Sequence, residues 1–170
     1  LEEKGINLSI SLLLRDTLEK SGYSVIMTRE EDKGLYDSSA ANKKAQDMQR
    51  RIAMIREYAP VLSVSIHQNS YQDEGVHGPQ VFYYESSVEG KKLAEAVQSS
   101  LNNQLEVDRP REVKGNTSYY LLKRSSGTLV IVECGFLTNP EEAQKLQTKE
   151  YQEKVAAAVS EGIRTYLNAQ

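Results

Sequence analysis

Two hydrophobic stretches of strand length dominate the pattern of apolar and polar positions along the chain. The first, V-L-S-V-S-I-H-Q-N-S (residues 61–70), alternates strictly between two faces. Its apolar face carries Leu62, Val64 and Ile66, and its other face carries Ser63, Ser65 and His67. The second stretch, T-L-V-I-V-E-C (residues 128–134), is a nearly continuous apolar run rich in β-branched residues, which is typical of a central parallel strand covered on both faces. The pattern therefore predicts two buried strands.

The rest of the chain alternates between helical and strand-like periodicity. Apolar residues recur at helical spacing in residues 5–21, 41–59, 86–105 and 151–166, and Asn139-Pro140-Glu141 is typical of the start of a short helix. Alternating stretches predict further strands near residues 23–29, 79–84 and 119–123. This order predicts an α/β fold with a single, mostly parallel twisted sheet and helices on both faces.

Size and charge narrow the class of protein. The chain has 170 residues, which is the size of one ordinary domain, and no linker or internal repeat divides it, so we expect a single domain over residues 1–170. The formal net charge of -3 is spread along the sequence and gives no basic stripe for nucleic acid. The apolar runs are too short to span a membrane, and the sequence begins without a signal peptide.

Candidate chemistry lies at the ends of the two buried strands. Open α/β sheets place their sites at the carboxyl ends of strands, where His67 and Glu133 fall. A strand-end histidine is often only hydrogen-bonded to a neighbour, and a buried glutamate is often paired with a base or a helix end. Two such residues on two strands nevertheless indicate a catalytic rim.

The single cysteine, Cys134, follows Glu133 and points to the opposite face. An inert core thiol is the simpler interpretation. The alternative is a metal-free hydrolase in which Cys134 is a nucleophile paired with His67, which would need a stabilised thiolate.

Five motifs together resemble the zinc-dependent N-acetylmuramoyl-L-alanine amidases of the amidase type 3 family. They occur in the family's order and span almost the whole chain: E-K-G-I-N-L (residues 3–8), M-T-R (27–29), S-I-H-Q-N-S (65–70), G-V-H-G-P-Q-V-F-Y-Y (75–84) and V-E-C-G-F-L-T-N-P-E-E (132–142). The G-L-Y-D segment (34–37) is more similar to the germination-specific, spore-cortex branch of the family.

The resemblance implies a zinc site and a reaction. Glu3 and His67 would be zinc ligands, a further histidine ligand would lie upstream of Leu1, and Glu133 would be the general base and acid. The chain would then lack the first strand of the fold and the metal-ligand turn after it. The bond cleaved in the family joins the lactyl group of N-acetylmuramic acid to L-alanine in peptidoglycan, outside the cytoplasm, here in spore-cortex maturation and muramic-lactam formation.

Further candidates concern substrate binding and the partners of the protein. Asn69 and Arg51 are candidate substrate-binding residues by their match to the family, and His77 is a rim histidine that is either exposed or a substitute zinc ligand. The expected partner is peptidoglycan with its peptide stems, with an accessory protein as a further option. The rival interpretation is a non-catalytic domain of the same fold that binds peptidoglycan or a protein partner.

Overall fold

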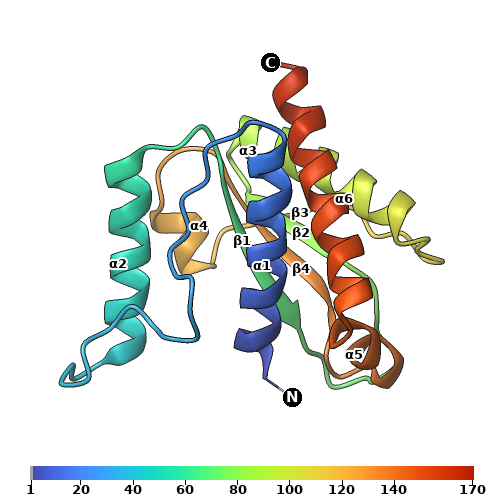
Figure 1. Cartoon of the computed structure of the whole chain (residues 1–170), viewed down its shortest axis with the longest axis horizontal. Coiled ribbons are helices and arrows are strands. Elements are labelled where there is room, and N and C mark those ends of the chain that lie inside the picture. Colours follow the sequence, from blue (N-terminus) through green and yellow to red (C-terminus); the bar gives the residue numbers. More distant parts are fainter. Residues whose placement is uncertain (1) are drawn as a thin grey trace.

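The computed structural model describes residues 2–170 and has a mixed α/β architecture, with helices packed against one sheet (Figure 1). Six helices occur in it: α1 (Glu3–Lys20), α2 (Lys43–Tyr58), α3 (Val88–Gln104), α4 (Tyr120–Arg124), α5 (Pro140–Leu146) and α6 (Lys149–Asn168). The strands are β1 (Ser63–Asn69), β2 (Gln80–Tyr84), β3 (Lys114–Asn116) and β4 (Leu129–Phe136). None of the helices in this part of the chain is long and apolar enough to cross a membrane.

The four strands form one open sheet in the order β1-β4-β2-β3. β1 pairs with β4 in parallel, and β2 pairs with β3 in parallel, whereas β2 and β4 are antiparallel. Two of these three pairings are parallel, which confirms the mostly parallel sheet predicted from the sequence. Every residue of β4 is buried, as expected for the central strand that the continuous apolar run predicted.

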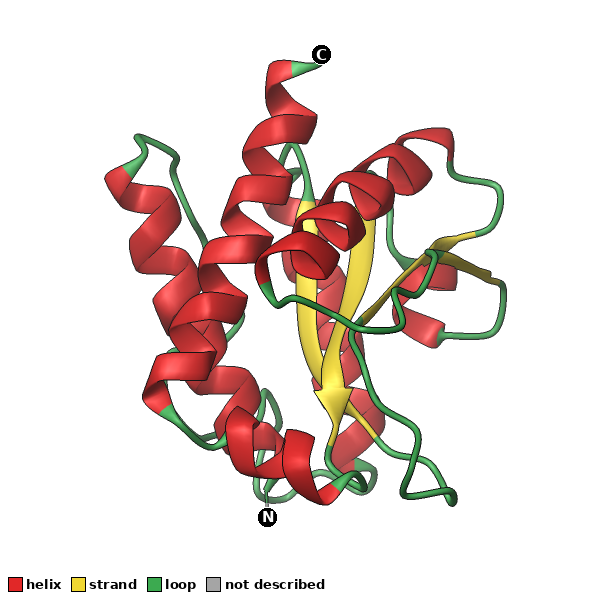
Figure 2. Cartoon of the chain, turned by 90° about the vertical axis from the view of Figure 1, so that its right-hand side faces the viewer, coloured by secondary structure: helices red, strands yellow, loops and turns green. Residues whose placement is uncertain are grey.

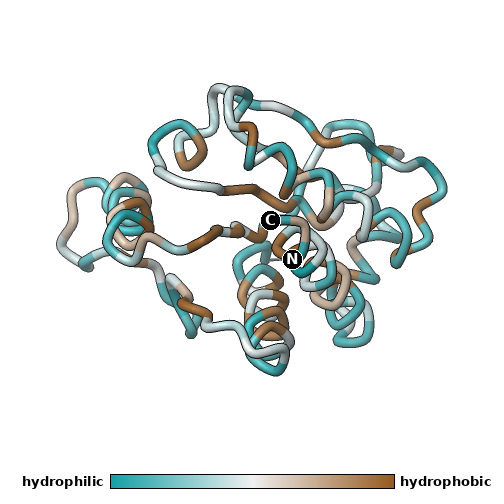
Figure 3. Tube along the Cα trace, turned by 90° about the horizontal axis from the view of Figure 1, so that it is seen from above, coloured by the Kyte–Doolittle hydropathy of each residue, from teal (hydrophilic) through white to brown (hydrophobic). Residues whose placement is uncertain are grey.

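Helices cover both faces of the sheet, as Figure 2 shows. On one face α1, α3 and α6 pack against the strands and form the larger core, which includes Ile10, Leu93, Val132, Val159 and Ile163. On the other face α2 and α4 contribute a smaller cluster with Ile52, Leu121, Leu122, Phe82 and Ile131. Hydrophobic segments of the trace accordingly gather toward the middle of the molecule (Figure 3).

The predicted strand at residues 23–29 is wrong. The segment is extended in part but belongs to no sheet, and Ile26 is 55% exposed. A strand is defined by hydrogen bonds to a neighbour, and the described residues place none beside this segment. It is held instead by side chains: Arg29 donates to the carbonyl of Lys4, and Thr28 accepts a hydrogen bond from Arg51.

The predicted strand at residues 119–123 is also wrong, because the chain there forms the short helix α4. The side chain of Asn116 accepts hydrogen bonds from the backbone N–H groups of Ser118 and Tyr119 and turns the chain into the helix. The adjacent Leu121 and Leu122 are both buried in this helix, where they join the smaller cluster. The strand in this region is β3, which the sequence did not indicate.

Candidate active site

His67 and Glu133 lie side by side at the same end of the sheet. They are Cα partners in the parallel β1–β4 ladder, and Gln80 at the start of β2 is the partner of Glu133 on its other side. Because parallel partners one strand apart point to the same face, both side chains lie on the face covered by α2 and α4. The register shifts just after them, since Asn69 pairs with Phe136, so the ladder is irregular where the site ends.

The third candidate, Glu3, reaches this site from the first turn of α1. One carboxylate oxygen lies 3.3 Å from Nδ1 of His67 and accepts a hydrogen bond from the backbone N–H of Gln68 at 3.1 Å. The hydrogen bond with His67 is the main cause that lowers the pKa of Glu3, against the opposing effect of burial. The structure thus joins two residues that are 64 positions apart in the sequence.

The imidazole of His67 is held between two groups. Its Nδ1 faces Glu3, and its Nε2 lies 2.9 Å from the hydroxyl of Ser65, which shares its face of β1. The side chain is 42% exposed, so a ligand can still reach it. A neighbouring carboxylate of this kind fixes the orientation of a histidine ring.

Glu133 has a different environment, because it is 9% exposed. Within residues 2–170, its Oε2 is buried and has no hydrogen-bond partner. Burial raises its pKa, and the negative charge of Glu3 acts in the same direction, whereas His67 opposes the shift. A carboxyl group with a raised pKa and a free oxygen is suited to accept and return a proton near neutral pH.

The side chains present fit a zinc ion in kind but not in number. Histidine nitrogen and glutamate oxygen are usual zinc ligands, and catalytic zinc sites have about three protein ligands. Glu3 and His67 provide two of them, and no group of three or more His, Cys, Asp or Glu residues within residues 2–170 is arranged to hold a metal ion. Oε2 of the neighbouring Glu133 is buried without a hydrogen-bond partner, so a polar group bound beside Glu3 and His67 would satisfy it.

The two candidate substrate-binding residues have different positions. Asn69 is at the end of β1, where its backbone carbonyl accepts from Leu137 and its side chain accepts from the N–H of Ser70. Arg51 lies in α2 and donates to Asp47 of the same helix at 2.7 Å and to Thr28 at 2.9 Å, and the bond to Thr28 connects α2 to residues 23–29. Its described hydrogen bonds include none to His67 or Glu133.

His77 and Cys134 are both engaged away from His67. The ring nitrogens of His77 contact the carbonyl of Gly75 and the carboxylate of Asp108, at 2.9 and 3.1 Å. Cys134 is fully buried on the opposite face, and burial raises the pKa of its thiol to about 12. A thiol with this pKa is protonated at neutral pH, which argues against the cysteine hydrolase.

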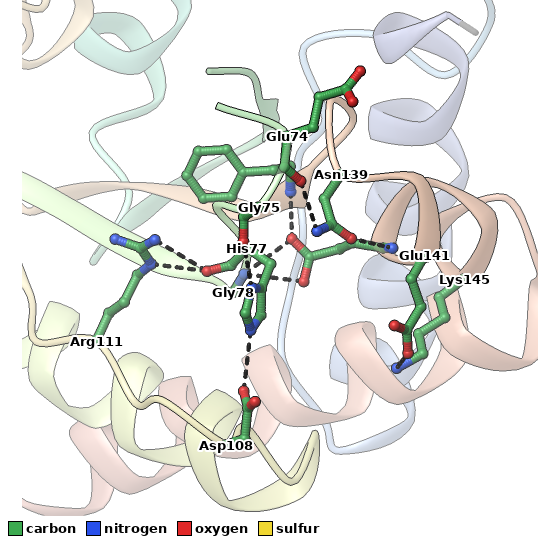
Figure 4. A network of polar contacts seen from close by, with 11 residues as sticks. Glu74, Gly75, His77, Gly78, Asp108, Arg111, Asn139, Glu141 and Lys145 are labelled. Carbon is green, nitrogen blue, oxygen red and sulfur yellow. Dashed lines mark hydrogen bonds and ion pairs between the residues drawn. The ribbon is translucent and has the colours of Figure 1, made fainter. Parts of the chain in front are cut away.

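A polar network at the rim was not expected from the sequence. It joins the β1–β2 loop (residues 70–79), the segment after α3 and the start of α5, and its main members are His77, Asp108, Arg111, Asn139 and Glu142 (Figure 4). Only the capping role of Asn139 was predicted, and its side chain indeed accepts from the N–H of Glu142 at 2.9 Å. Glu142 was not predicted, because an acidic residue in the first turn of a helix ordinarily indicates no more than a favourable interaction with the helix dipole.

Comparisons with known proteins agree with this geometry. The family model described as N-acetylmuramoyl-L-alanine amidase matches residues 1–165. The germination-specific N-acetylmuramoyl-L-alanine amidase of Bacillus subtilis is 35% identical over 168 residues, which cover 97% of this chain and 70% of that protein.

Solved structures of amidases have the same fold. The CwlD amidase of Clostridioides difficile, solved in complex with the GerS lipoprotein, has a TM-score of 0.97 and 36% identity, over 100% of this chain and 88% of that one. The amidase AmiC2 of Nostoc punctiforme has a TM-score of 0.85 and 29% identity, over 99% of this chain and 86% of that one. The family model covers nearly all of the chain, including both strands that carry the paired His67 and Glu133, and the chain therefore belongs to the N-acetylmuramoyl-L-alanine amidase family of peptidoglycan hydrolases.

Proposed function

We propose that the protein is a zinc-dependent hydrolase of the amide bond between the lactyl group of N-acetylmuramic acid and L-alanine. The observation that supports this most is the pairing of His67 with Glu133 across two parallel strands, with Glu3 bonded to the same histidine. The two candidate zinc ligands, Glu3 and His67, thus lie beside the buried carboxyl group of Glu133, whose pKa is raised. Amide hydrolysis needs both functions, because the carbonyl must be polarised and a proton must reach the leaving amine.

Glu3 and His67 would hold the zinc ion. The chemistry that zinc supplies in such sites is Lewis acidity toward a carbonyl and a lowered pKa for water. Through the family resemblance we assign the third ligand to a histidine upstream of Leu1. His77 is a poorer candidate, because both of its ring nitrogens already contact acceptors at the rim.

Glu133 would transfer the proton. Its unpartnered oxygen would accept a proton from the attacking water and then return it to the departing amine of L-alanine. Burial supports this role, since it raises the pKa of the carboxyl group and thereby makes it a stronger base. Asn69, at the end of the same strand as His67, and Arg51, which is bonded to Thr28, would contact or orient the substrate.

Two relatives support a biological setting for this proposal: one is a germination-specific amidase, and another was solved with a lipoprotein. We propose that this protein acts on the cell-wall side of the membrane, in maturation of the spore cortex and formation of muramic lactam. The substrate would be glycan strands with peptide stems. An accessory protein would then assist the enzyme.

The test is cleavage of purified muropeptides by the protein with its upstream segment. We expect release of the peptide stem with a free L-alanine amino group, loss of activity with a metal chelator, recovery with zinc, and no effect of a thiol alkylator. Binding to peptidoglycan without cleavage would favour the non-catalytic domain instead. Inhibition by the alkylator alone would restore the cysteine hydrolase.

A further inference from the structure

The carboxylate of Glu142 is buried beside the active site but belongs to none of the groups assigned above. It lies in the first turn of α5, and the residue is 9% exposed. A buried carboxylate is costly unless hydrogen bonds or a cation compensate its charge. No salt bridge to Glu142 occurs in the described part of the chain, so its charge must be compensated in another way.

Backbone N–H groups provide this compensation. The N–H of Gly78 donates to both carboxylate oxygens at 3.0 Å, and the N–H of Phe136 donates to Oε1 at 2.5 Å. This carboxylate therefore lies between the β1–β2 loop and the end of β4. Hydrogen bonds from neutral donors to a charged acceptor are about twice as strong as neutral ones. One side chain therefore joins two backbone segments that do not pair as strands.

Two glycines leave room for this arrangement. A Cβ built on Gly135 would lie 2.7 Å from the carboxyl carbon of Glu142, which real Cβ atoms do not tolerate. Gly78 has φ of +101°, a conformation that side chains with a Cβ rarely adopt, and it directs its N–H toward Glu142. Gly78, Gly135 and Glu142 thus depend on one another, although they lie on three different segments.

Other contacts hold the same loop at neighbouring points. The guanidinium of Arg111 donates to the carbonyl of His77 at 3.0 Å, and Nε2 of His77 contacts Asp108. The side-chain amide of Asn139 donates to the carbonyl of Glu74 at 3.0 Å. Glu142 differs from these residues because its side chain also accepts a hydrogen bond from the backbone of β4, the strand that carries Glu133.

The loop and the strand end that Glu142 joins both continue from the candidate catalytic residues. The loop leaves β1 directly after Asn69, two residues beyond His67, and enters β2 at Gln80, the Cα partner of Glu133. Phe136 is the Cα partner of Asn69, at the point where the β1–β4 register shifts. The ladder is locally disrupted at this point, so the hydrogen bond from Phe136 to Glu142 adds to the contacts that hold the two strand ends.

We propose that Glu142 is a positioning residue for the amidase reaction, which holds the β1–β2 loop against the end of β4 and thereby fixes the site between His67 and Glu133. This rests on the function proposed above for those two residues. Misplacing reacting groups by about 1 Å costs about a hundredfold in rate, so a loose loop would affect turnover as well as folding.

The test compares Glu142→Gln with Glu141→Gln, the same change one position earlier. Glutamine keeps an oxygen in the place of Oε1, which both amides reach, but its NH₂ group replaces Oε2 and faces the N–H of Gly78. Gly78 therefore loses one of its two acceptors, and the bonds that remain lose the charge of the acceptor and become weaker. The control residue Glu141 is 82% exposed and forms only a surface ion pair with Lys145. We expect Glu142→Gln to reduce kcat/KM by about tenfold to a hundredfold, with changes in both kcat and KM, well below the melting temperatures of both variants. Glu141→Gln should behave as wild type.

Hydrogen exchange measures the anchor independently of catalysis. In Glu142→Gln, the amides of Gly78 and Phe136 should exchange faster than in wild type, and amides in the core of β4 should not. Unchanged kinetic constants in a folded Glu142→Gln protein, or unchanged exchange at both amides, would overturn the proposal. A wild-type protein that cleaves no muropeptide would instead refute the proposed function, and the exchange at Gly78 and Phe136 would still show whether Glu142 anchors the loop.

A second pair of variants covers the case in which Glu142→Gln does not fold. Gly135→Ala should lower activity in the wild-type background, because its Cβ displaces the Glu142 carboxylate. In a Glu142→Ala background, the same change should cost little more, because the clashing atoms are gone. Equal losses in both backgrounds would show that the two residues are not coupled and would contradict the proposal.

Discussion

Two glutamates near one histidine have opposite pKa shifts in this protein. The hydrogen bond to His67 lowers the pKa of Glu3, whereas burial raises the pKa of Glu133. Groups whose surroundings separate their pKa values in this way commonly have separate roles, one remaining ionised and one exchanging protons. At the scale of single residues, the environment therefore favours Glu3 as a ligand and Glu133 as the proton carrier.

Replacing Glu133 with glutamine tests this division. The amide keeps the shape of the side chain and removes its capacity to accept a proton, so turnover should fall by at least about a hundredfold while zinc binding survives. His67→Ala should lose both. Muropeptide cleavage and metal content measure the two effects separately, and wild-type turnover in Glu133→Gln would mean that another group is the base.

The pKa of His77 gives a prediction on pH. The carbonyl of Gly75 and then the carboxylate of Asp108 raise it above 6.5, with a smaller contribution from the charge of Glu142. Because the folded-state pKa is raised, its contribution to stability is complete below the unfolded pKa and is lost as the pH rises through the folded one. Asp108→Asn should lower the pKa of His77 but leave it raised, because the hydrogen bond with the carbonyl of Gly75, which is the larger cause, remains.

An NMR titration of the histidine ring protons checks this result. The chain has 2 histidines, so the His77 resonance can be identified by its loss in His77→Gln. Thermal unfolding should lose less stability between acidic and alkaline pH in Asp108→Asn than in wild type. A His77 pKa that does not change in the variant would contradict the ion pair.

The candidate site could be predicted from the sequence only where the pattern fixed a strand end. The alternation of residues 61–67 and the apolar run before Glu133 placed both residues on strands, and the parallel arrangement placed them together. Glu142 could not be predicted in the same way. Its partners are backbone groups of Gly78 and Phe136, and the sequence pattern gives no sign of a backbone N–H that needs an acceptor.

At the scale of elements, long periodic segments were predictable and short ones were not. The helix expected at residues 5–21 is Glu3–Lys20, and the strand expected at residues 128–134 is Leu129–Phe136. In contrast, residues 119–123 offered one pair of leucines, which fits a strand or a helical turn equally well. The side chain of Asn116 decided between them through local hydrogen bonds to the N–H groups of Ser118 and Tyr119, an Asx-type turn that was not recognised from the sequence.

The packing of α3 on α6 depends on one glycine and provides a test at this scale. A Cβ on Gly162 would lie 2.5 Å from the Cα of Val97 and 3.0 Å from the carbonyl oxygen of Ala96. Since these atoms belong to the backbone, the helices must move apart, and Gly162→Ala should destabilise the protein by about 1–3 kcal/mol. For a domain of this size, each kcal/mol lowers Tm by about 2–4 °C.

Gly5→Ala is the matched control, because Gly5 also lies in a helix and a Cβ there meets nothing within 4 Å. Alanine is the better helix former, by up to about 1 kcal/mol, so this variant should melt at the same or a higher temperature. Thermal unfolding of the two variants would disagree with the structure if both lost stability equally.

At the scale of the whole molecule, zinc should couple the site to stability. A ligand that binds only the folded state raises Tm by mass action, and its effect depends on how tightly it binds. On the proposed assignment, Glu3 and His67 are the two zinc ligands among the described residues, so residues 1–170 should gain little on addition of zinc. A longer chain with the upstream histidine should gain clearly more.

The measurement is thermal unfolding with and without zinc for both chains, together with metal analysis. Tight, stoichiometric zinc in residues 1–170 that is abolished by His77→Ala would show that His77 completes the site. That outcome would contradict the assignment of the third ligand to the upstream segment.

The distance along the chain between the site residues has a consequence for folding. Glu3 contacts His67 across 64 positions, and His67 pairs with Glu133 across a further 66 (133 − 67). The chain loses the conformational entropy of closing such long loops before the stabilising contacts form. Chains with this topology therefore fold slowly compared with helical bundles. The three groups also come from three successive parts of the chain, and a fragment must span residues 3–133 to contain them all. Activity should therefore return during refolding only with the final cooperative step, after much of the helical signal has already recovered.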